Sequence, residues 1–222
     1  MDGNGRWARE RGKSRLAGHR AGAEAAREVV TAAAENGIET LTLYAFSSEN
    51  WARPRSEVEG LWRLLTRFLA KKTPELVRQG IRLRSIGRRE GIPPEALSAL
   101  ESAESATAGG TRMTLCLALN YGAQDEIVDA ARALAREAAA GSLRPEQIDR
   151  GTFESRLYTA GLPPVDLLIR TGGEVRVSNF LLWQISYAEL YFSRVYWPDF
   201  TRDHFARALE AFARRERRFG GL

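Results

Sequence analysis

Short apolar runs alternate with longer amphipathic stretches along nearly the whole chain, and this alternation constrains the fold more than any other feature. It is typical of sheet proteins in which a helix follows each strand, so that most strands run parallel. We therefore expect an α/β protein with a mostly parallel central sheet flanked by helices. The apolar runs predict strands at 40–46, 81–86, 112–119, 165–169 and 189–196.

The stretches between these runs predict helices whose ends can be identified. A helix over about 18–35 is rich in alanine and closes at Gly37, which favours a left-handed cap. The next helix is expected to start with a capping box at Ser56 and Glu59, and its apolar stripe over 58–69 could be core or could line a cavity. Further helices are predicted near 94–108, near 124–140 and after Thr201, with short helices and loops over 141–164.

The length of 222 residues predicts one domain spanning 1–222. No stretch approaches the roughly 18 consecutive apolar residues of a membrane span, so we expect a soluble protein. The single cysteine, Cys116, lies in the apolar run LCLAL, which favours a buried, inert thiol and excludes a disulfide framework. Because no secretion signal is evident, we expect a cytoplasmic location.

The chain carries a net charge of +5, and only three of its 33 basic residues are lysines. Arginine binds phosphate with a planar fork of donors. Most of these arginines can be explained as solvated helix faces, so only those on motif loops deserve a functional interpretation. A nucleic-acid partner is not expected, because zinc-finger spacing, an RNA-recognition signature and a sustained basic helix are all absent from the sequence.

Unusual polar segments follow the predicted strands. SSENWARP comes after Phe46, NYG after Leu119 and RTGGEVRVSN after Ile169, and the opening MDGNGRWA fits the same pattern. Loops that leave the carboxyl ends of parallel strands gather at one edge of the sheet, where ligands bind. We therefore expect these segments to converge on one crevice.

The opening segment could be a phosphate cradle or a plain turn, because alternating glycines serve both purposes. Asp2 favours the cradle, since a carboxylate beside a phosphate site is repulsive unless a divalent cation such as Mg²⁺ lies between them. Arg15 and His19 stand four residues apart at the start of the next helix, where an anion is favoured, although His19 could equally be a surface residue.

The segment 170–179 is the most informative. Arg170, Arg176 and Ser178 are interleaved with glycines directly after a buried strand, which suits a diphosphate-binding pocket. Downstream, Glu189 lies in the apolar setting YAELYF, where a carboxylate is costly unless it is paired. It is a candidate metal ligand or one half of an ordinary salt bridge.

Taken together, the ordered motifs resemble those of the cis-prenyltransferases. The matching stretches run nearly end to end: MDGNGRWA, GHRAG, LYAFSSENWARP, LALNYG, LLIRTGGEVRVSNFLLWQISYAELYF, WPDF and RERRFGG. The DDxxD motif of the trans-prenyl synthases is absent from the sequence. The resemblance implies a transferase that condenses isopentenyl diphosphate onto an allylic primer, such as farnesyl or geranyl diphosphate, to make a cis-polyprenyl lipid-carrier precursor for cell-wall synthesis.

The resemblance also implies roles for individual residues. Asp2 is expected to be the catalytic carboxylate and to hold Mg²⁺, with Glu189 as a second metal ligand across a homodimer contact, and Asn50 is expected to act in catalysis. Substrate binding is expected at Gly3, Asn4, Gly5, Arg6, Trp7, Arg15, His19, Ser47, Ser48, Glu49, Asn50, Trp51, Arg53, Arg170, Arg176, Ser178, Arg218 and Gly220. An apolar tunnel for the growing chain and a peripheral membrane contact for product release are further expectations.

The sequence departs from the family at three places. A segment that includes a first strand normally precedes the MDGNG motif, so we expect a misassigned start, a truncation, or a sheet without a central strand and an Asp2 loop that is poorly anchored. Val175 stands where histidine is common, and Ala123 and Gln124 replace the usual glycine and arginine. A non-catalytic partner subunit and a phosphate-ester hydrolase remain alternatives, although the intact Asp2–Arg6 motif disfavours the first and the lack of a phosphatase signature disfavours the second.

Overall fold

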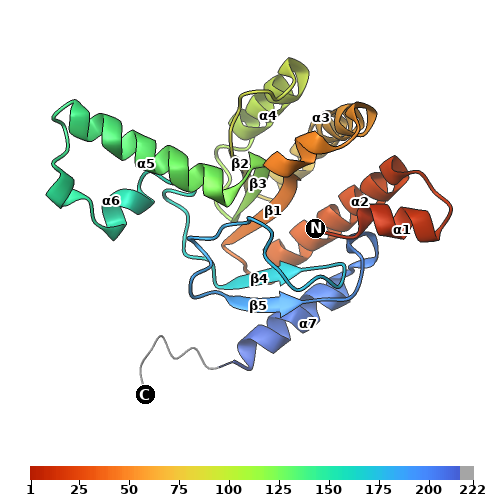
Figure 1. The fold of residues 1–222 in the computed structure, drawn as a ribbon. Helices are drawn as coiled ribbons and strands as arrows, with labels where there is room; N and C mark the ends of the chain where they lie inside the picture. The colour runs from red at the N-terminus through yellow and green to blue at the C-terminus, as the bar shows by residue number, and fades with distance from the viewer. Residues whose placement is uncertain (216–222) are drawn as a thin grey trace.

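The computed structural model describes residues 1–215, and its elements follow the predicted alternation (Figure 1). The strands are β1 (Thr40–Ser47), β2 (Ile81–Ile86), β3 (Met113–Tyr121), β4 (Leu167–Arg170) and β5 (Glu189–Phe192). The α-helices are α1 (Asn4–Glu10), α2 (Arg15–Glu35), α3 (Arg55–Arg78), α4 (Pro94–Ala106), α5 (Ala123–Ala139), α6 (Arg150–Glu154) and α7 (Arg202–Ala213). Short 3₁₀ helices are η1 (Ser48–Ala52), η2 (Pro145–Gln147) and η3 (Trp197–Asp199).

The strands form two parallel sheets within the described residues. One has the order β1-β3-β2, and the other pairs β4 with β5, with Arg170 opposite Phe192 and Leu167 opposite Glu189. The prediction of a parallel α/β fold is therefore confirmed. The strands differ from the predicted ranges mainly at their ends: β5 stops at Phe192 and β3 runs on to Tyr121.

Both faces of β3 are buried, which explains its almost unbroken apolar sequence. Met113, Leu115 and Leu117 belong to the main core, which they share with α2, α3 and α4. Cys116 and Ala118 point into a second, smaller cluster with residues at the start of α5. Cys116 is fully buried and free, as predicted, and burial raises the pKa of its thiol to about 11.

The predicted helix ends are confirmed at two helices and wrong at one. Gly37 adopts a left-handed conformation after α2, and Thr201 caps α7 with His204. The capping box at Ser56 is wrong, because α3 begins one residue earlier, after Pro54, which has no side chain able to cap it. Proline fixes the chain entering α3, so this helix starts without the polar cap that the sequence suggested.

A large cavity of about 900 Å³ separates the two sheets. Residues of β1 line one side of it and residues of β4 line the other, and each of these is an edge strand of its sheet within residues 1–215. None of the helices in residues 1–215 combines the length and the apolarity that a membrane crossing requires.

Candidate functional site

The polar loops after β1 and β4 meet at the mouth of the 900 Å³ cavity, as the parallel topology predicted. Asn179, in the loop after β4, donates a hydrogen bond to Glu49 at 2.7 Å, and its Oδ1 accepts one from the backbone of Gln124 at 2.9 Å. This residue therefore joins the ends of three strands. Eight predicted site residues line the cavity: Asp2, Ser47, Glu49, Asn50, Arg53, Arg170, Arg176 and Ser178.

The backbone of Asp2 is tied to the loop after β4 and to η3. Its N–H donates to the Thr171 hydroxyl at 3.0 Å, and its carbonyl accepts from Thr171 at 3.0 Å and from the Trp197 N–H at 2.9 Å. Gly172 permits this close approach: its φ is +86°, and a Cβ there would lie 2.8 Å from an Arg6 nitrogen. Asp2 is thus held by defined contacts, unlike the poorly anchored loop considered above.

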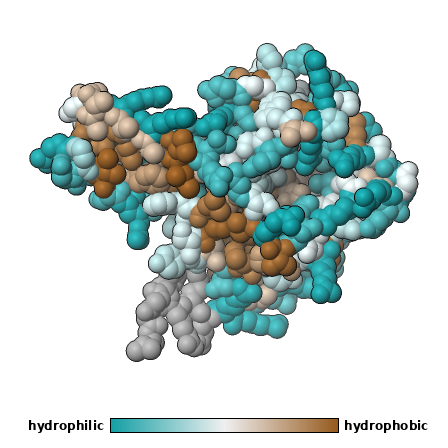
Figure 2. Space-filling view, viewed as in Figure 1, coloured by the Kyte–Doolittle hydropathy of each residue, from teal (hydrophilic) through white to brown (hydrophobic). Residues whose placement is uncertain are grey.

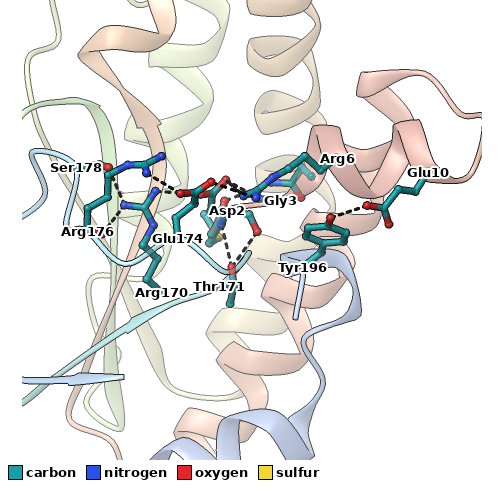
Figure 3. Close-up of polar contacts among 12 residues, drawn as sticks. Asp2, Gly3, Arg6, Glu10, Arg170, Thr171, Glu174, Arg176, Ser178 and Tyr196 are labelled. Atoms are coloured by element: carbon teal, nitrogen blue, oxygen red, sulfur yellow. Dashed lines mark hydrogen bonds and ion pairs between the residues drawn. The ribbon is translucent and has the colours of Figure 1, made fainter. Parts of the chain in front are cut away.

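The Asp2 carboxylate lies between two arginines (Figure 3). Arg170 Nη2 is 3.0 Å from Oδ2, and Arg6 Nη2 is 3.3 Å from Oδ1. Burial alone would raise the pKa of Asp2, but the hydrogen bonds from Arg170 and from the Gly3 N–H, with the Arg6 charge, hold this pKa below its usual value. The side chain is therefore an ionised carboxylate at neutral pH.

Arg170 also reaches Ser178 and the backbone carbonyl of Arg176, so one guanidinium links three predicted residues (Figure 3). Its Nη1 lies 2.6 Å from Ser178 Oγ. Its Nε is buried and has no hydrogen-bond partner. Glu174 bridges Arg6 at 3.3 Å and Arg176 at 2.6 Å. We call this group the Arg170 cluster (Asp2, Arg6, Arg170, Arg176 and Ser178), and its three guanidinium groups can receive an anion.

A second group surrounds Glu57 on α3, and we call it the Glu57 cluster (Arg15, His19, Arg53 and Glu57). The Glu57 side chain is only 9% exposed and contacts Arg15 at 3.1 Å, Arg53 at 3.2 Å and His19 Nε2 at 3.4 Å. Burial lowers the pKa of His19 more than the hydrogen bond to Glu57 raises it, so the imidazole is mainly neutral at pH 7. Two guanidinium groups and one ring nitrogen thus converge on one carboxylate.

A smaller cavity of about 190 Å³ begins beside the Glu57 cluster, where Asn4, His19, Asn50 and Arg53 line it. Asn50 and Arg53 line both cavities, so the two spaces adjoin. The Oδ1 atom of Asn4 is buried and has no partner. Beyond these polar residues the wall becomes apolar and includes side chains of the stripe predicted over 58–69, such as Leu65 and Leu69. That stripe serves both the core and the cavity.

The SSENW segment forms η1, and several of its predicted binding residues hold that turn in place. Ser47 and Asn50 make a capping box at its start. Trp51 Nε1 donates to Asn120 Oδ1 at 2.7 Å, which connects η1 to the NYG motif. Ser48 lies against Gly122, where an added Cβ would come within 2.6 Å of its hydroxyl.

Other predicted residues lie away from both cavities or outside the described part. Trp7 contacts Arg11 and donates to Asp199 at 2.7 Å, and it lines neither cavity. Glu189 begins β5, at the opposite end from Arg170, and pairs with Arg215. Arg218 and Gly220 lie outside the described residues. Gly3 is the left-handed residue that precedes α1, and Gly5 lies in the first turn of that helix, where an added Cβ would touch Arg15.

Within residues 1–215, no three histidine, cysteine or acidic side chains cluster closely enough to form a complete metal cage. The Asp2 carboxylate lines the large cavity and is ionised. Mg²⁺ typically binds through one or two carboxylates together with substrate phosphates. The donor set therefore fits a metal that arrives with an anionic substrate.

Sequence reasoning missed Glu57 and Glu174, the two acids that hold the predicted arginines together. Glu174 stands inside the RTGGEVR motif, but no pattern of spacing marks it as a bridge. Glu57 lies four residues after Arg53, a spacing that could have suggested a helical ion pair. Its contacts with Arg15 and His19 depend on how α2 packs against α3 and could not be found locally.

Comparison with protein families gives a match over residues 1–220 to the model described as "Putative undecaprenyl diphosphate synthase". An isoprenyl transferase of Agrobacterium fabrum is 53% identical over all of this chain and 90% of its own length. The ditrans,polycis-undecaprenyl-diphosphate synthase ((2E,6E)-farnesyl-diphosphate specific) of Escherichia coli is 52% identical over all of this chain and 87% of its own length.

Solved structures agree with these matches. Lavandulyl diphosphate synthase from Lavandula x intermedia, in complex with dimethylallyl diphosphate, superposes with a TM-score of 0.97 at 38% identity, covering 99% of this chain and 95% of that one. A probable undecaprenyl diphosphate synthase from Campylobacter jejuni gives a TM-score of 0.79 at 34% identity, covering 90% and 92%.

Proposed function

The chain belongs to the undecaprenyl diphosphate synthase family of prenyltransferases, and we propose that it condenses isopentenyl diphosphate onto an allylic diphosphate primer such as farnesyl diphosphate. The product is a cis-polyprenyl diphosphate that serves as a lipid-carrier precursor. The observation that carries this proposal is the pair of adjoining cavities: one has the Arg170 cluster at its mouth, and the other leads from the Glu57 cluster into an apolar interior.

The two clusters suit two diphosphates. The Arg170 cluster offers Arg170, Arg176 and the Ser178 hydroxyl to the diphosphate of isopentenyl diphosphate. We assign the allylic diphosphate to Asn4 and His19, which line the smaller cavity, together with Arg15 of the Glu57 cluster and Arg6 of the Arg170 cluster. Its isoprenoid tail enters the apolar part of that cavity. The buried, unpartnered atoms Arg170 Nε and Asn4 Oδ1 support this assignment, because polar atoms that lack a protein partner are available to a ligand.

Asp2 is the residue that would hold Mg²⁺ together with diphosphate oxygens, and Glu189 of a second copy is the other candidate ligand. When bound, the metal neutralises charge on the departing diphosphate. The low pKa of Asp2 keeps its carboxylate ready for this role.

The chain's own residues supply the remaining steps. Arginines of the two clusters stabilise the negative charge that develops as the allylic carbon–oxygen bond breaks. Asn50, which lines both cavities, orients the two substrates so that the isopentenyl double bond faces the allylic carbon. The apolar wall of the smaller cavity limits the access of water to the allylic cation, so that the cation reacts with the double bond rather than being hydrolysed. Loss of a proton from the isopentenyl unit then completes the condensation.

Incubation with labelled isopentenyl diphosphate and unlabelled farnesyl diphosphate tests the activity directly. An extended polyprenyl diphosphate supports the synthase. Release of free phosphate without chain extension would support a hydrolase, and no product at all would support a non-catalytic subunit. The measurement is chromatographic separation of labelled products by length, with magnesium and with chelator as paired conditions.

We also propose a homodimer of single-domain chains working in the cytoplasm. Figure 2 shows apolar residues at the surface near β4 and β5. Close to Glu189 in the sequence, Tyr187 is 66% exposed and Leu190 is 36% exposed. Leu190→Asp is expected to lower the mass measured by light scattering. The exposed basic row Arg63, Arg67 and Lys71 on α3 suits a peripheral contact with an anionic membrane during product release.

A further inference from the structure

The 190 Å³ cavity follows α3 away from the Glu57 cluster. Its walls come from α2, α3 and the face of the three-stranded sheet, including Ala26, Leu65 and Leu115. Lys72, Thr73 and Leu76 line its far end. Lys72 follows Glu57 by about 15 residues, or about 22 Å along a helix. The cavity therefore has a polar head and a long apolar body.

The far end carries an ion pair where the rest of the body is apolar. Lys72 Nζ lies 3.2 Å from Glu75 Oε2, and the two side chains are only 17% and 25% exposed. Thr73 turns its hydroxyl to the carbonyl of Leu69 in its own helix, at 2.7 Å. Among the described residues that line this cavity, Lys72 is the one charged side chain away from the Glu57 cluster end.

Each isoprenoid unit that a growing hydrocarbon chain buries against apolar walls stabilises the bound chain further. At Lys72 this gain ends, because a further unit must push the ammonium group away from Glu75 and leave charge without a partner in a mostly buried place. After each condensation, the diphosphate of the lengthened chain can return to the primer position only while the tail can still move forward into apolar space.

We propose that the Lys72–Glu75 ion pair is the floor of the product cavity and sets the maximum length of the polyprenyl chain. This inference rests on the proposed synthase function. It assigns the length limit to a charged pair rather than to the bulk of an apolar side chain.

The test is the product-length distribution of Lys72→Met and Lys72→Ala, measured by mass spectrometry with farnesyl diphosphate as primer. Both variants are expected to shift the main product to greater length by one or more five-carbon units, and Lys72→Ala by more, because it also removes the side-chain stem. The rate of the first condensation should stay within about twofold of wild type, since that step takes place at the other end of the cavity. Arg78→Met, which changes an exposed cation in the last turn of the same helix, is the matched control and should leave the length unchanged.

Unchanged or shorter products from both Lys72 variants would overturn the proposal. If those variants fail to fold, Glu75→Gln with Ala26→Leu replaces them. Glu75→Gln should lengthen the product, and Ala26→Leu, which narrows the cavity nearer its head, should shorten it. No change of length in that pair overturns the proposal as well. If the wild-type protein makes no extended product, the proposed synthase function itself is wrong. If the wild-type protein makes extended products and the variants make products of the same length, only the proposed role of the Lys72–Glu75 pair is wrong.

Discussion

Arg170 Nη2 donates a hydrogen bond to Asp2 Oδ2 at 3.0 Å, across a separation of 168 residues. The same guanidinium contacts Ser178, so the opening segment and the loop after β4 share one cation. Loss of either partner therefore removes the opposite charge beside the other and the hydrogen bond that orients it.

Asp2→Asn is expected to reduce turnover by at least about 10²-fold, because it removes the charge that would hold the metal and that pairs with Arg170. The backbone contacts with Thr171 and Trp197 remain, so the circular dichroism spectrum should be unchanged. Asp203→Asn, on the exposed first turn of α7, is the matched control. Full activity of the Asp2 variant would show that its assigned role is wrong.

Glu57→Gln is expected to raise the KM for the allylic primer by about tenfold while changing the KM for isopentenyl diphosphate much less. The reason is positional: Glu57 holds Arg15, His19 and Arg53 in one arrangement. Steady-state kinetics with each substrate varied in turn make the measurement, and Glu59→Gln, which pairs with Arg55 on the exposed side of α3, is the control. Equal changes in both KM values would contradict a role confined to the primer.

Asp129 gives a prediction for stability in acid. Two hydrogen bonds from Arg88, opposed by burial and helped by Tyr158, lower the pKa of Asp129 to about 2. A lowered carboxyl pKa stabilises the fold above the usual value of 3.8, and this contribution is lost as the pH falls toward 2.

Wild type should therefore exceed Asp129→Asn in free energy of unfolding by about 1 to 2 kcal/mol near neutral pH, after allowance for solvent screening. Urea titrations at a series of pH values should show this difference shrinking below pH 3.8. A difference that stays constant down to pH 2 would mean that the Arg88 pairing does not stabilise the fold.

The edge strands β1 and β4 give a prediction about a polypeptide that is extended at its amino end. A version extended upstream of Met1 by an apolar, strand-forming segment should pair with these edges inside the 900 Å³ cavity. We expect its urea midpoint and its rate of isopentenyl incorporation to rise together, because the extra strand would join the two sheets and stiffen the Asp2 loop. A matched extension of glycine and serine should give neither gain.

Much of the fold was predictable from the sequence because its periodic signals are strong. The range 81–86 coincides with β2, and the apolar run around Cys116 gave a strand buried on both faces. The convergence of the loops after β1 and β4 on one cavity followed from parallel topology, whereas the NYG segment after β3 lines neither cavity. The predicted start of α3 was wrong because Pro54 occupies the cap position, so that Ser56 lies inside the helix and does not cap it.

Site residues were predictable where they belong to a sequence motif. They were not predictable where their contacts depend on how distant elements pack together. Asp2, Arg170 and Ser178 could be picked out from their loops, and the structure brings them together. Glu57 could not be singled out, because its partners lie on other elements. Trp7 was included with its motif, but its contacts are with Arg11 and Asp199 and depend on how α1 packs against η3.

The wall shared by the two cavities has a consequence for repeated condensation. Because Asn50 and Arg53 are two of the six residues that line both spaces, a newly lengthened molecule can become the next primer by moving its head group a short way past this shared wall. Its tail never has to leave the hydrocarbon-lined interior. A protein built this way would add many units during a single encounter, and its processivity would depend on those two residues more than on its affinity for the starting primer.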